Sequence, residues 1–183
     1  LFGTTSMLAV TITFERKGRS FDRLLLAPIS LSTMVAAKLS GAILFGLLNA
    51  FVPVIFATFF VSLSGINWSV VLLAVFLIAV TSALLGLVIA VSAKEVFEAQ
   101  TFSNFFRFPM LFLCGLFIPI SSLPVFLRPL SYLLPLTYGT DLLSGAILNT
   151  SVLSPMLSIV ILLIFVIGLF VFCHYNIQRK WIL

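Results

Sequence analysis

The sequence predicts an all-α integral membrane protein built from transmembrane helices. Hydrophobic residues fill 62% of its 183 positions and charged residues only 8%, a balance that a soluble domain could not expose to water without aggregating. The apolar stretches are continuous rather than alternating, which favours helices over a barrel, because a backbone in lipid must satisfy its own hydrogen bonds. The longest such stretch, from Leu39 to Ala93, contains no Asp, Glu, Lys or Arg over 55 residues.

The first apolar run covers residues 1–14 and ends in a basic segment. As a helix it would span only about 21 Å, short of the roughly 30 Å hydrocarbon core of a bilayer. The run begins at Leu1, and the chain lacks the basic leader of a signal peptide. We therefore expect that the start of this helix, and sequence before it, are missing.

The charge-free stretch is long enough for two crossings. Residues 64–68 supply the turn between them, because Ser, Gly and Asn favour turns and Trp68 suits the headgroup boundary. This division predicts helices near 35–63 and 68–91. Later apolar runs at about 104–120 and 152–175 bring the expected number of crossings to five.

The segment 121–148 is not expected to cross the membrane. It contains Pro124, Pro129 and Pro135, together with Arg128 and Asp141, which suit a lipid-facing helix poorly. We expect short broken helices that enter one side of the bilayer and return, forming an external re-entrant segment.

The distribution of basic residues agrees with this topology. With 121–148 on the outside, only Arg128 lies on the outer face, and a strong basic bias marks the cytoplasmic face. The C-terminus is then cytoplasmic, and the whole chain, 1–183, forms one multi-pass transmembrane domain in the cell membrane. The nine basic residues expected on the cytoplasmic face are Arg16, Lys17, Arg19, Arg23, Lys38, Lys94, Arg107, Arg179 and Lys180.

The cytoplasmic loop 15–34 has helix signals of its own. Ser20 can cap a helix, Asp22 suits the first turn, and Pro28 limits the far end. Phe21, Leu24 and Leu25 would then share one apolar face. Such a helix either lies on the lipid surface or docks a cytosolic partner, and the residues alone leave both open.

Two motifs resemble the membrane subunits of type-2 ATP-binding-cassette (ABC) exporters. The run E-R-x-x-x-S-F-D-R-L-L-x-x-P-I-S at 15–30 resembles the family segment E-R-E-x-G-T-x-x-x-L-L-x-x-P-I-S. A second run, G-L-F-I-P-I-S-S-L-P at 115–124 followed by L-P-L-T-Y-G at 134–139, is similar to the signature before the family's final helix. The chain departs from the family pattern at Lys17, commonly acidic, and at Ser144, often arginine.

The resemblance implies a permease with six helices in the full chain, a coupling helix that docks on a nucleotide-binding subunit, and re-entrant helices that close the exit. It also implies a cytosolic ABC ATPase that binds ATP and Mg²⁺, a second permease copy or homologue, surrounding lipid, and no nucleic acid. No cofactor is expected in this chain itself. The residues expected to couple to the ATPase are Glu15, Arg16, Phe21, Asp22, Arg23, Leu24, Leu25 and Pro28. The residues assigned to a possible exit gate are Pro119, Pro124 and Asp141.

Other residues support no enzymatic site. The sequence contains no G-x-x-x-x-G-K-[ST] motif for nucleotide phosphates, and its single histidine, His174, is expected at the membrane interface rather than on a metal. Cys114 and Cys173 fall toward opposite faces, so no disulfide is expected.

Small and polar residues within the spans are expected to contact other helices. Ser82, Gly86 and Ala90 recur every fourth residue and predict a ridge that another helix can approach closely. Thr81 either bonds a neighbouring helix or lines a pathway. Glu95 and Glu98, in the turn after this helix together with Lys94, either cap a helix and form an exposed i, i+4 pair or make a second contact to the ATPase subunit.

The function predicted is export of an amphipathic drug, lipid or lipid-linked glycan, with ATP hydrolysed by a separate subunit. The alternatives are an ATP-independent secondary carrier, which would usually need an ionisable residue in mid-membrane, and a structural assembly subunit. An intramembrane enzyme would need a nucleophile and base at membrane depth.

Overall fold

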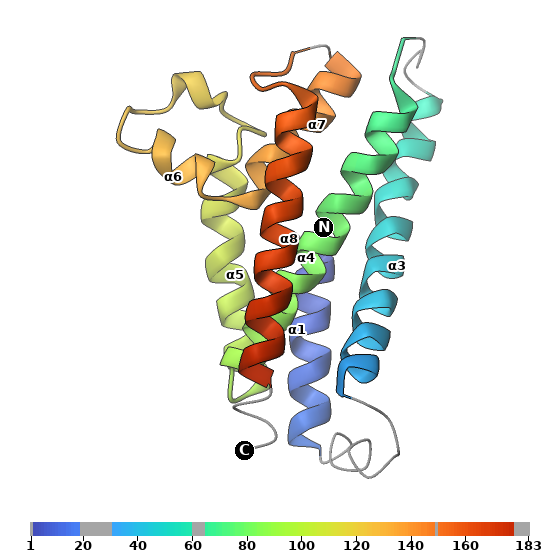
Figure 1. Ribbon diagram of the computed structural model, residues 1–183, viewed down its shortest axis with the longest axis vertical. Coiled ribbons are helices and arrows are strands. Elements are labelled where there is room, and N and C mark those ends of the chain that lie inside the picture. The colour runs from blue at the N-terminus through green and yellow to red at the C-terminus, as the bar shows by residue number, and fades with distance from the viewer. Residues whose placement is uncertain (1, 19–30, 60–64, 149, 178–183) are drawn as a thin grey trace.

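The computed structural model describes residues 2–18, 31–59, 65–148 and 150–177, and all regular structure in these ranges is helical (Figure 1). Five longer helices form a bundle, and three shorter ones connect two of its members at one end. The long helices are α1 (Phe2–Lys17), α3 (Leu31–Thr58), α4 (Trp68–Ser92), α5 (Val96–Leu113) and α8 (Pro155–Ile177). The short ones are η1 (Ile120–Ser122), α6 (Arg128–Tyr132) and α7 (Pro135–Leu148).

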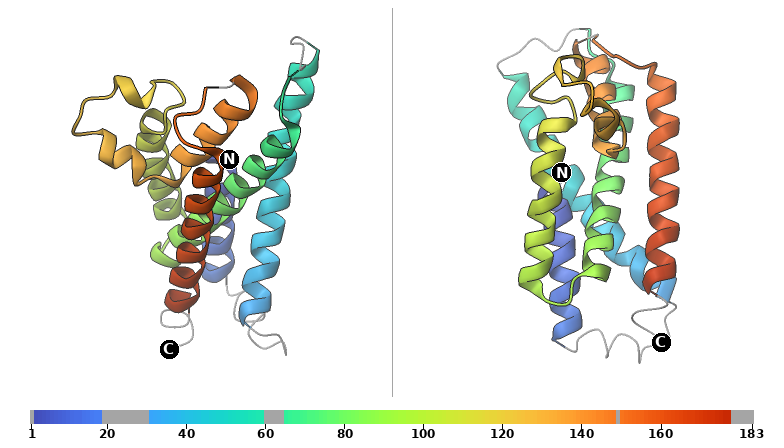
Figure 2. Two further views of the ribbon diagram at one scale, coloured as in Figure 1. Left: turned by 45° about the horizontal axis from the view of Figure 1, so that its top comes forward. Right: turned by 90° about the vertical axis from the view of Figure 1, so that its left-hand side faces the viewer.

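Three of the described helices are long and apolar enough to cross a membrane: α3 over Thr33–Phe56, α4 over Trp68–Ser92 and α8 over Pro155–Ile177. Helix α1 runs from about the middle of the bundle to its lower end, and α5 lies beside it (Figures 1 and 2). The prediction of an all-α integral membrane protein is confirmed.

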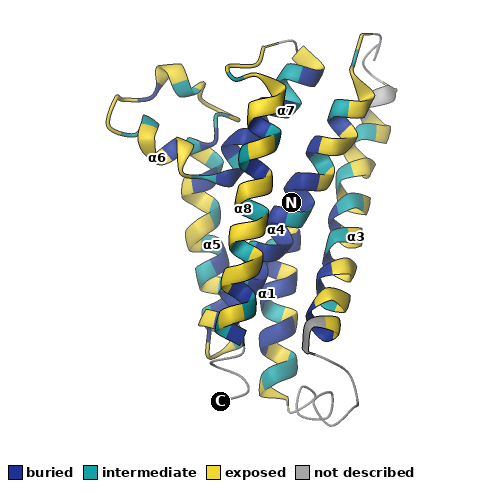
Figure 3. Cartoon of the chain, viewed as in Figure 1, coloured by how far each residue is buried: buried dark blue, intermediate teal, exposed yellow. Residues whose placement is uncertain are grey.

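Helix α4 is the centre of the bundle. In the most apolar stretch of α4, 67% of the residues are buried inside the protein. The corresponding share is 17% in α3 and in α8, whose outer faces are exposed (Figure 3). Around its lower half, Leu84 and Leu87 pack with apolar residues of α1, α3 and α8. Around its upper half, Ala74 and Leu77 pack with Tyr138 of α7 and with α8. Since five other described helices, α1, α3, α5, α7 and α8, contact α4, its position fixes the arrangement of the rest.

The small-residue ridge predicted on α4 is the surface that α1 contacts. Thr5 Oγ1 donates a hydrogen bond to the carbonyl oxygen of Ser82 at 3.1 Å, and the main chain of Thr5 lies directly over Gly86. One step further along, the guanidinium of Arg16 lies 3.5 Å from the carbonyl oxygen of Ala90. Because the ridge residues are small, the two backbones approach closely enough for these polar contacts.

The segment before α8 is broken into short helices, as predicted for 121–148. η1, α6 and α7 all lie at the upper end of the bundle, where α5 ends and α8 begins (Figure 2). Arg128 closes the first turn by donating to the carbonyl oxygens of Ser121 and Leu123. Thr140 of α7 donates to the carbonyl oxygen of Cys114, which joins α7 to the end of α5.

Several predicted boundaries are wrong. Helix α5 covers Val96–Leu113 rather than 104–120, because Glu98 and Gln100 lower the hydropathy of its first turns without interrupting the helix and Gly115, with φ of +85°, ends it. Helix α1 continues through Lys17 and α3 begins at Leu31, so the loop predicted over 15–34 is shorter at both ends. Cys114 and Cys173 are both free, as expected.

Replacing Gly86 with alanine should destabilise the protein. The added Cβ would lie 2.6 Å from the backbone oxygen of Thr5, and backbone atoms cannot rotate away. Overpacking of this kind costs about 1–3 kcal/mol. We expect a lower melting temperature in detergent for Gly86→Ala. Gly168→Ala is the control, because its Cβ would meet no described atom of a neighbouring element within 4 Å. Equal melting temperatures for the two variants would show that α1 does not contact the ridge.

Candidate coupling site

The last turn of α1, the first turns of α3 and the α4–α5 turn lie at the lower end of the bundle (Figure 1), and charged residues from these three parts form ion pairs. We call this group the basal cluster: Glu15, Arg16 and Lys17 of α1, Lys38 of α3 and Glu95 of the α4–α5 turn. It includes two of the residues predicted for coupling, Glu15 and Arg16. The cluster stands where α1 ends and α3 begins, so it flanks the chain between them.

Glu15 and Lys38 link α1 to α3. The ammonium of Lys38 donates to both carboxylate oxygens of Glu15, and the two side chains are only 23% and 30% exposed. Partial burial reduces the screening by water, so this pair holds the two helix ends together more firmly than a surface pair.

Arg16 caps the C-terminus of α4. Its guanidinium donates to the carbonyl oxygens of Ala90 and Ala93, which lie in the last turn of α4 and just beyond it. The final carbonyls of a helix have no partner within the helix, and a cation near them is also favoured by the helix dipole. Arg16 therefore joins the end of α1 to the end of α4.

The α4–α5 turn completes the cluster. Lys17 Nζ lies 2.9 Å from Glu95 Oε1, and this contact lowers the pKa of the Glu95 carboxyl, first through the hydrogen bond from Lys17 and then through its charge. Glu98 accepts a hydrogen bond of 2.7 Å from the backbone N–H of Lys94. The capping function predicted for Glu98 is confirmed, whereas Glu95 pairs with α1 instead.

The other predicted coupling residues, Phe21, Asp22, Arg23, Leu24, Leu25 and Pro28, lie outside the described residues. The structure shows the helices that precede and follow this segment. One of its ends follows the helix that carries Glu15, Arg16 and Lys17, and its other end leads into the helix that carries Lys38.

The residues predicted for an exit gate lie at the upper end but not together. Pro119 and Pro124 flank η1 in the turn that Arg128 closes. Asp141 on α7 instead accepts hydrogen bonds from the backbone N–H groups of Val152 and Leu153 and from Ser158. Asp141 thus holds the start of α8 against α7.

Arg107 lies away from the place predicted for it. Arg107 was expected at the cytoplasmic face, yet it donates to Ser6 Oγ from α1, about 16 Å along that helix from Lys17 at 1.5 Å per residue. That prediction is wrong, because Arg107 lies within the bundle.

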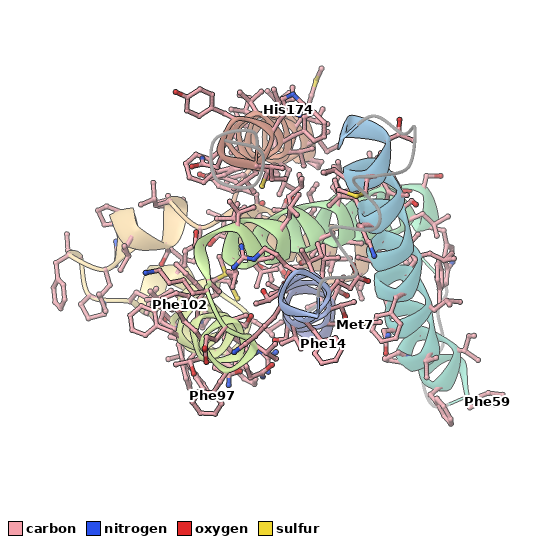
Figure 4. The ribbon with its side chains drawn as sticks, turned by 90° about the horizontal axis from the view of Figure 1, so that it is seen from below. Met7, Phe14, Phe59, Phe97, Phe102 and His174 are labelled. Atoms are coloured by element: carbon pink, nitrogen blue, oxygen red, sulfur yellow. The ribbon has the colours of Figure 1, made fainter. Side chains whose placement is uncertain are left out.

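His174 lies on α8, away from α1 and α5 (Figure 4), and stacks on Phe170 with ring centroids 6.4 Å apart.

Comparison with known proteins shows the family of this chain. A family model described as "ABC-2 type transporter" matches residues 1–148. The inner membrane transport permease YadH of Escherichia coli (strain K12) is 27% identical over 161 residues, which cover 88% of this chain and 63% of YadH. Nodulation protein J of Sinorhizobium fredii is 28% identical over 159 residues, 81% of this chain and 60% of that protein. The chain thus spans about three fifths of the length of these curated relatives.

The Glu15–Lys38 pair should show a measurable coupling energy. We expect Glu15→Lys and Lys38→Glu each to lower the melting temperature in detergent, because each places two like charges together. The double exchange should recover most of the loss, with a coupling energy on the order of 1 kcal/mol for a partly exposed pair. Strict additivity of the two single changes would show that the side chains do not interact.

The pKa of Glu95 should depend on Lys17 alone among its basic neighbours. In wild type it lies below 4.5, so the contribution of this contact to stability is present at neutral pH and is lost as pH falls through the lowered pKa. We expect Lys17→Met to raise the pKa toward 4.5, measured by ¹³C NMR of labelled glutamate carboxyls. Lys94→Met is the control and should leave it in place. A pKa that is the same in wild type and Lys17→Met would contradict the contact.

Proposed function

This chain belongs to the ABC-2 type transporter family, as the permease subunit of a type-2 ABC transporter, and from this premise we propose that it forms the membrane path of an ATP-driven exporter. It is a multi-pass membrane protein of the transport permease class. A partnering ABC ATPase subunit is implied by the family in general. Export, the direction of the chain in the membrane and the residues that contact the motor are parts of the proposal.

The observation that carries the proposal is the basal cluster. It ties the ends of α1 and α3, which flank residues 19–30, to the turn between α4 and α5. A force applied to the segment 19–30 would therefore act on α1, α3, α4 and α5 together. A segment on which a motor subunit acts must transmit force to several helices in this way.

In the proposed mechanism, residues 19–30 dock on the ATPase from the cytoplasmic side, with Phe21, Leu24 and Leu25 as the apolar contact. Two permease copies, or this chain and a homologue, enclose the pathway. Closure of the ATPase pair around ATP and Mg²⁺, both bound by the motor, shifts the population from an inward-facing to an outward-open arrangement. The permease itself performs no hydrolysis.

The upper end of the bundle is assigned to the exterior. Helix α7 is joined to the end of α5 through Thr140 and to the start of α8 through Asp141, so movement of those long helices would displace it. We propose that this displacement opens and closes the exit, with Pro119 and Pro124 as rigid corners of the moving segment. The cargo is an amphipathic molecule.

Aspartate substitutions in the coupling segment test the proposal. In the helix predicted there, Leu25 belongs to the apolar face and Leu26 does not. We expect Leu25→Asp to reduce both ATPase capture and transport-linked ATP hydrolysis at least tenfold, because a charge would be buried in the contact. Leu26→Asp makes the same chemical change off the face and should retain most of both. The measurements are co-purification with the cognate ATPase and hydrolysis rates in reconstituted vesicles.

Two outcomes would contradict the assignment. Normal motor binding by Leu25→Asp would exclude residues 19–30 as the docking segment. Labelling of a cysteine introduced at Arg19 by an impermeant reagent from outside intact cells would place the segment on the wrong side of the membrane.

A further inference from the structure

A cavity of about 160 Å³ lies among α4, α5 and α7 and also touches one residue each of α1 and α8. Apolar side chains form much of its wall, among them Ile78, Leu85 and Leu136. Hydroxyl groups and one cation from three helices form the polar part: Thr5 of α1, Thr81 and Ser82 of α4, and Ser103 and Arg107 of α5. An apolar chamber with a few polar groups in its wall is the usual form of a small-molecule site.

Two of these hydroxyl groups are placed to accept a hydrogen bond from a ligand. Thr81 Oγ1 donates its hydrogen to the carbonyl oxygen of Leu77 at 2.7 Å, and Ser103 Oγ donates to that of Ala99 at 2.8 Å. A hydroxyl group has one hydrogen and two lone pairs, so both oxygens keep lone pairs for an incoming donor. The two residues are only 4% and 2% exposed, and both line the cavity. A ligand group that donates to them must therefore lie inside it.

The wall favours a neutral ligand. Arg107, which donates to Ser6, brings a positive charge to the cavity, so an ammonium group would meet a like charge. A carboxylate would have to leave water, and Thr81 and Ser103 would offer it no hydrogen, because theirs already bond carbonyl groups. A neutral O–H donor avoids both costs.

The size of the cavity sets the apolar part of the ligand. A cavity of about 150 Å³ lined by apolar side chains accepts a benzene ring. The present cavity, at about 160 Å³, has comparable room. It therefore suits one ring with a small polar substituent, and it is too small for a whole phospholipid.

The position of Thr81 links the two parts of the ligand. Ile78, Thr81 and Leu85 stand at i, i+3 and i+7 on α4, which places them along one face of this helix. All three line the cavity. A ring that lies against the two apolar side chains would hold its substituent next to the hydroxyl oxygen between them.

We propose that this cavity binds a neutral aromatic alcohol, whose hydroxyl donates to Thr81 Oγ1 while its ring lies against Ile78, Leu85 and Leu136. The site would hold the ring of such a cargo, and it rests on the proposed function only for the ligand's being carried. Binding itself needs neither ATP nor export. A failure of binding would therefore leave the transport assignment intact, and a failure of motor coupling would leave this site intact.

The test measures binding of radiolabelled phenol to the permease–ATPase complex in nanodiscs without ATP, after subtraction of uptake by protein-free nanodiscs. Phenol is neutral at pH 7, since a phenolic hydroxyl has a pKa of about 10. Unlabelled phenol should compete. Toluene has nearly the same size and anisole keeps the oxygen, but neither can donate, so both should compete at least tenfold more weakly. Benzoate and benzylammonium should also be weaker, because their charge must leave water.

Three results of the binding test would contradict the proposal. Phenol uptake no greater than that of protein-free nanodiscs would overturn the site itself. Equal competition by anisole would overturn the hydrogen bond from the ligand. Tighter binding of benzoate or benzylammonium than of phenol would overturn the neutral class.

A matched pair of threonine variants isolates the hydroxyl group. Thr81→Val exchanges the hydroxyl for a methyl group, and it should weaken phenol binding at least tenfold while toluene competes as well as before. Thr13→Val is the control, because Thr13 is also buried and donates to the carbonyl oxygen of Ala9 at 2.7 Å, but does not line the cavity. It should bind phenol as wild type does. An unchanged preference for phenol over toluene in Thr81→Val would overturn the assignment.

Two further variants keep the test decisive if Thr81→Val does not fold. Leu136→Trp fills the cavity without removing a hydroxyl and should weaken phenol and toluene alike. Wild-type affinity for phenol in this variant would overturn the site. Ser103→Ala removes the other buried acceptor and should change phenol binding less than threefold. A tenfold loss there would move the hydrogen bond to Ser103 and overturn the part given to Thr81.

Discussion

The close approach of α1 to α4 across Ser82 and Gly86 is the contact on which the rest of the structure depends. Lipid tails are as apolar as leucine, so helices in a bilayer gain little from hiding apolar surface and associate through packing and polar contacts. The glycine lets the two backbones come together along the lower half of α4. That approach places Arg16 over the last carbonyls of α4 and Ser6 beside Arg107. The basal cluster and the contact between α1 and Arg107 both follow from it.

The sequence predicted those parts of the fold that depend on local pattern. Long apolar stretches located α3, α4 and α8, and the prolines located the broken segment before α8. The ridge on α4 was predicted from spacing alone. Helix α5 was misplaced by about eight residues at its start, because its first turns carry Glu98 and Gln100. Hydropathy identifies helices that are apolar along their whole length, whereas α5 packs on α1 through Ala99 and carries polar residues beside it.

The candidate site shows a different limit. Glu15 and Arg16 were selected from the resemblance to a family, but the other members of the basal cluster were not. Lys38 lies 23 residues from its partner Glu15, and Glu95 lies 78 residues from its partner Lys17. Only the packing of α1 between α3 and α5 brings these charges together. Arg107 was assigned to the membrane surface because the predicted span began too late. An arginine within a correctly placed α5 would have indicated an interior position.

The cap that Arg16 provides for α4 restricts how the bundle can rearrange. The guanidinium belongs to one helix and the carbonyls to another, so a piston-like slide of α1 along α4 by one turn, about 5.4 Å, would uncap α4. A rotation of α1 and α4 together as a rigid lever preserves the cap. Rigid-body tilting of this helix pair is therefore the easier motion, and the hinges for that motion must lie in other parts of the bundle.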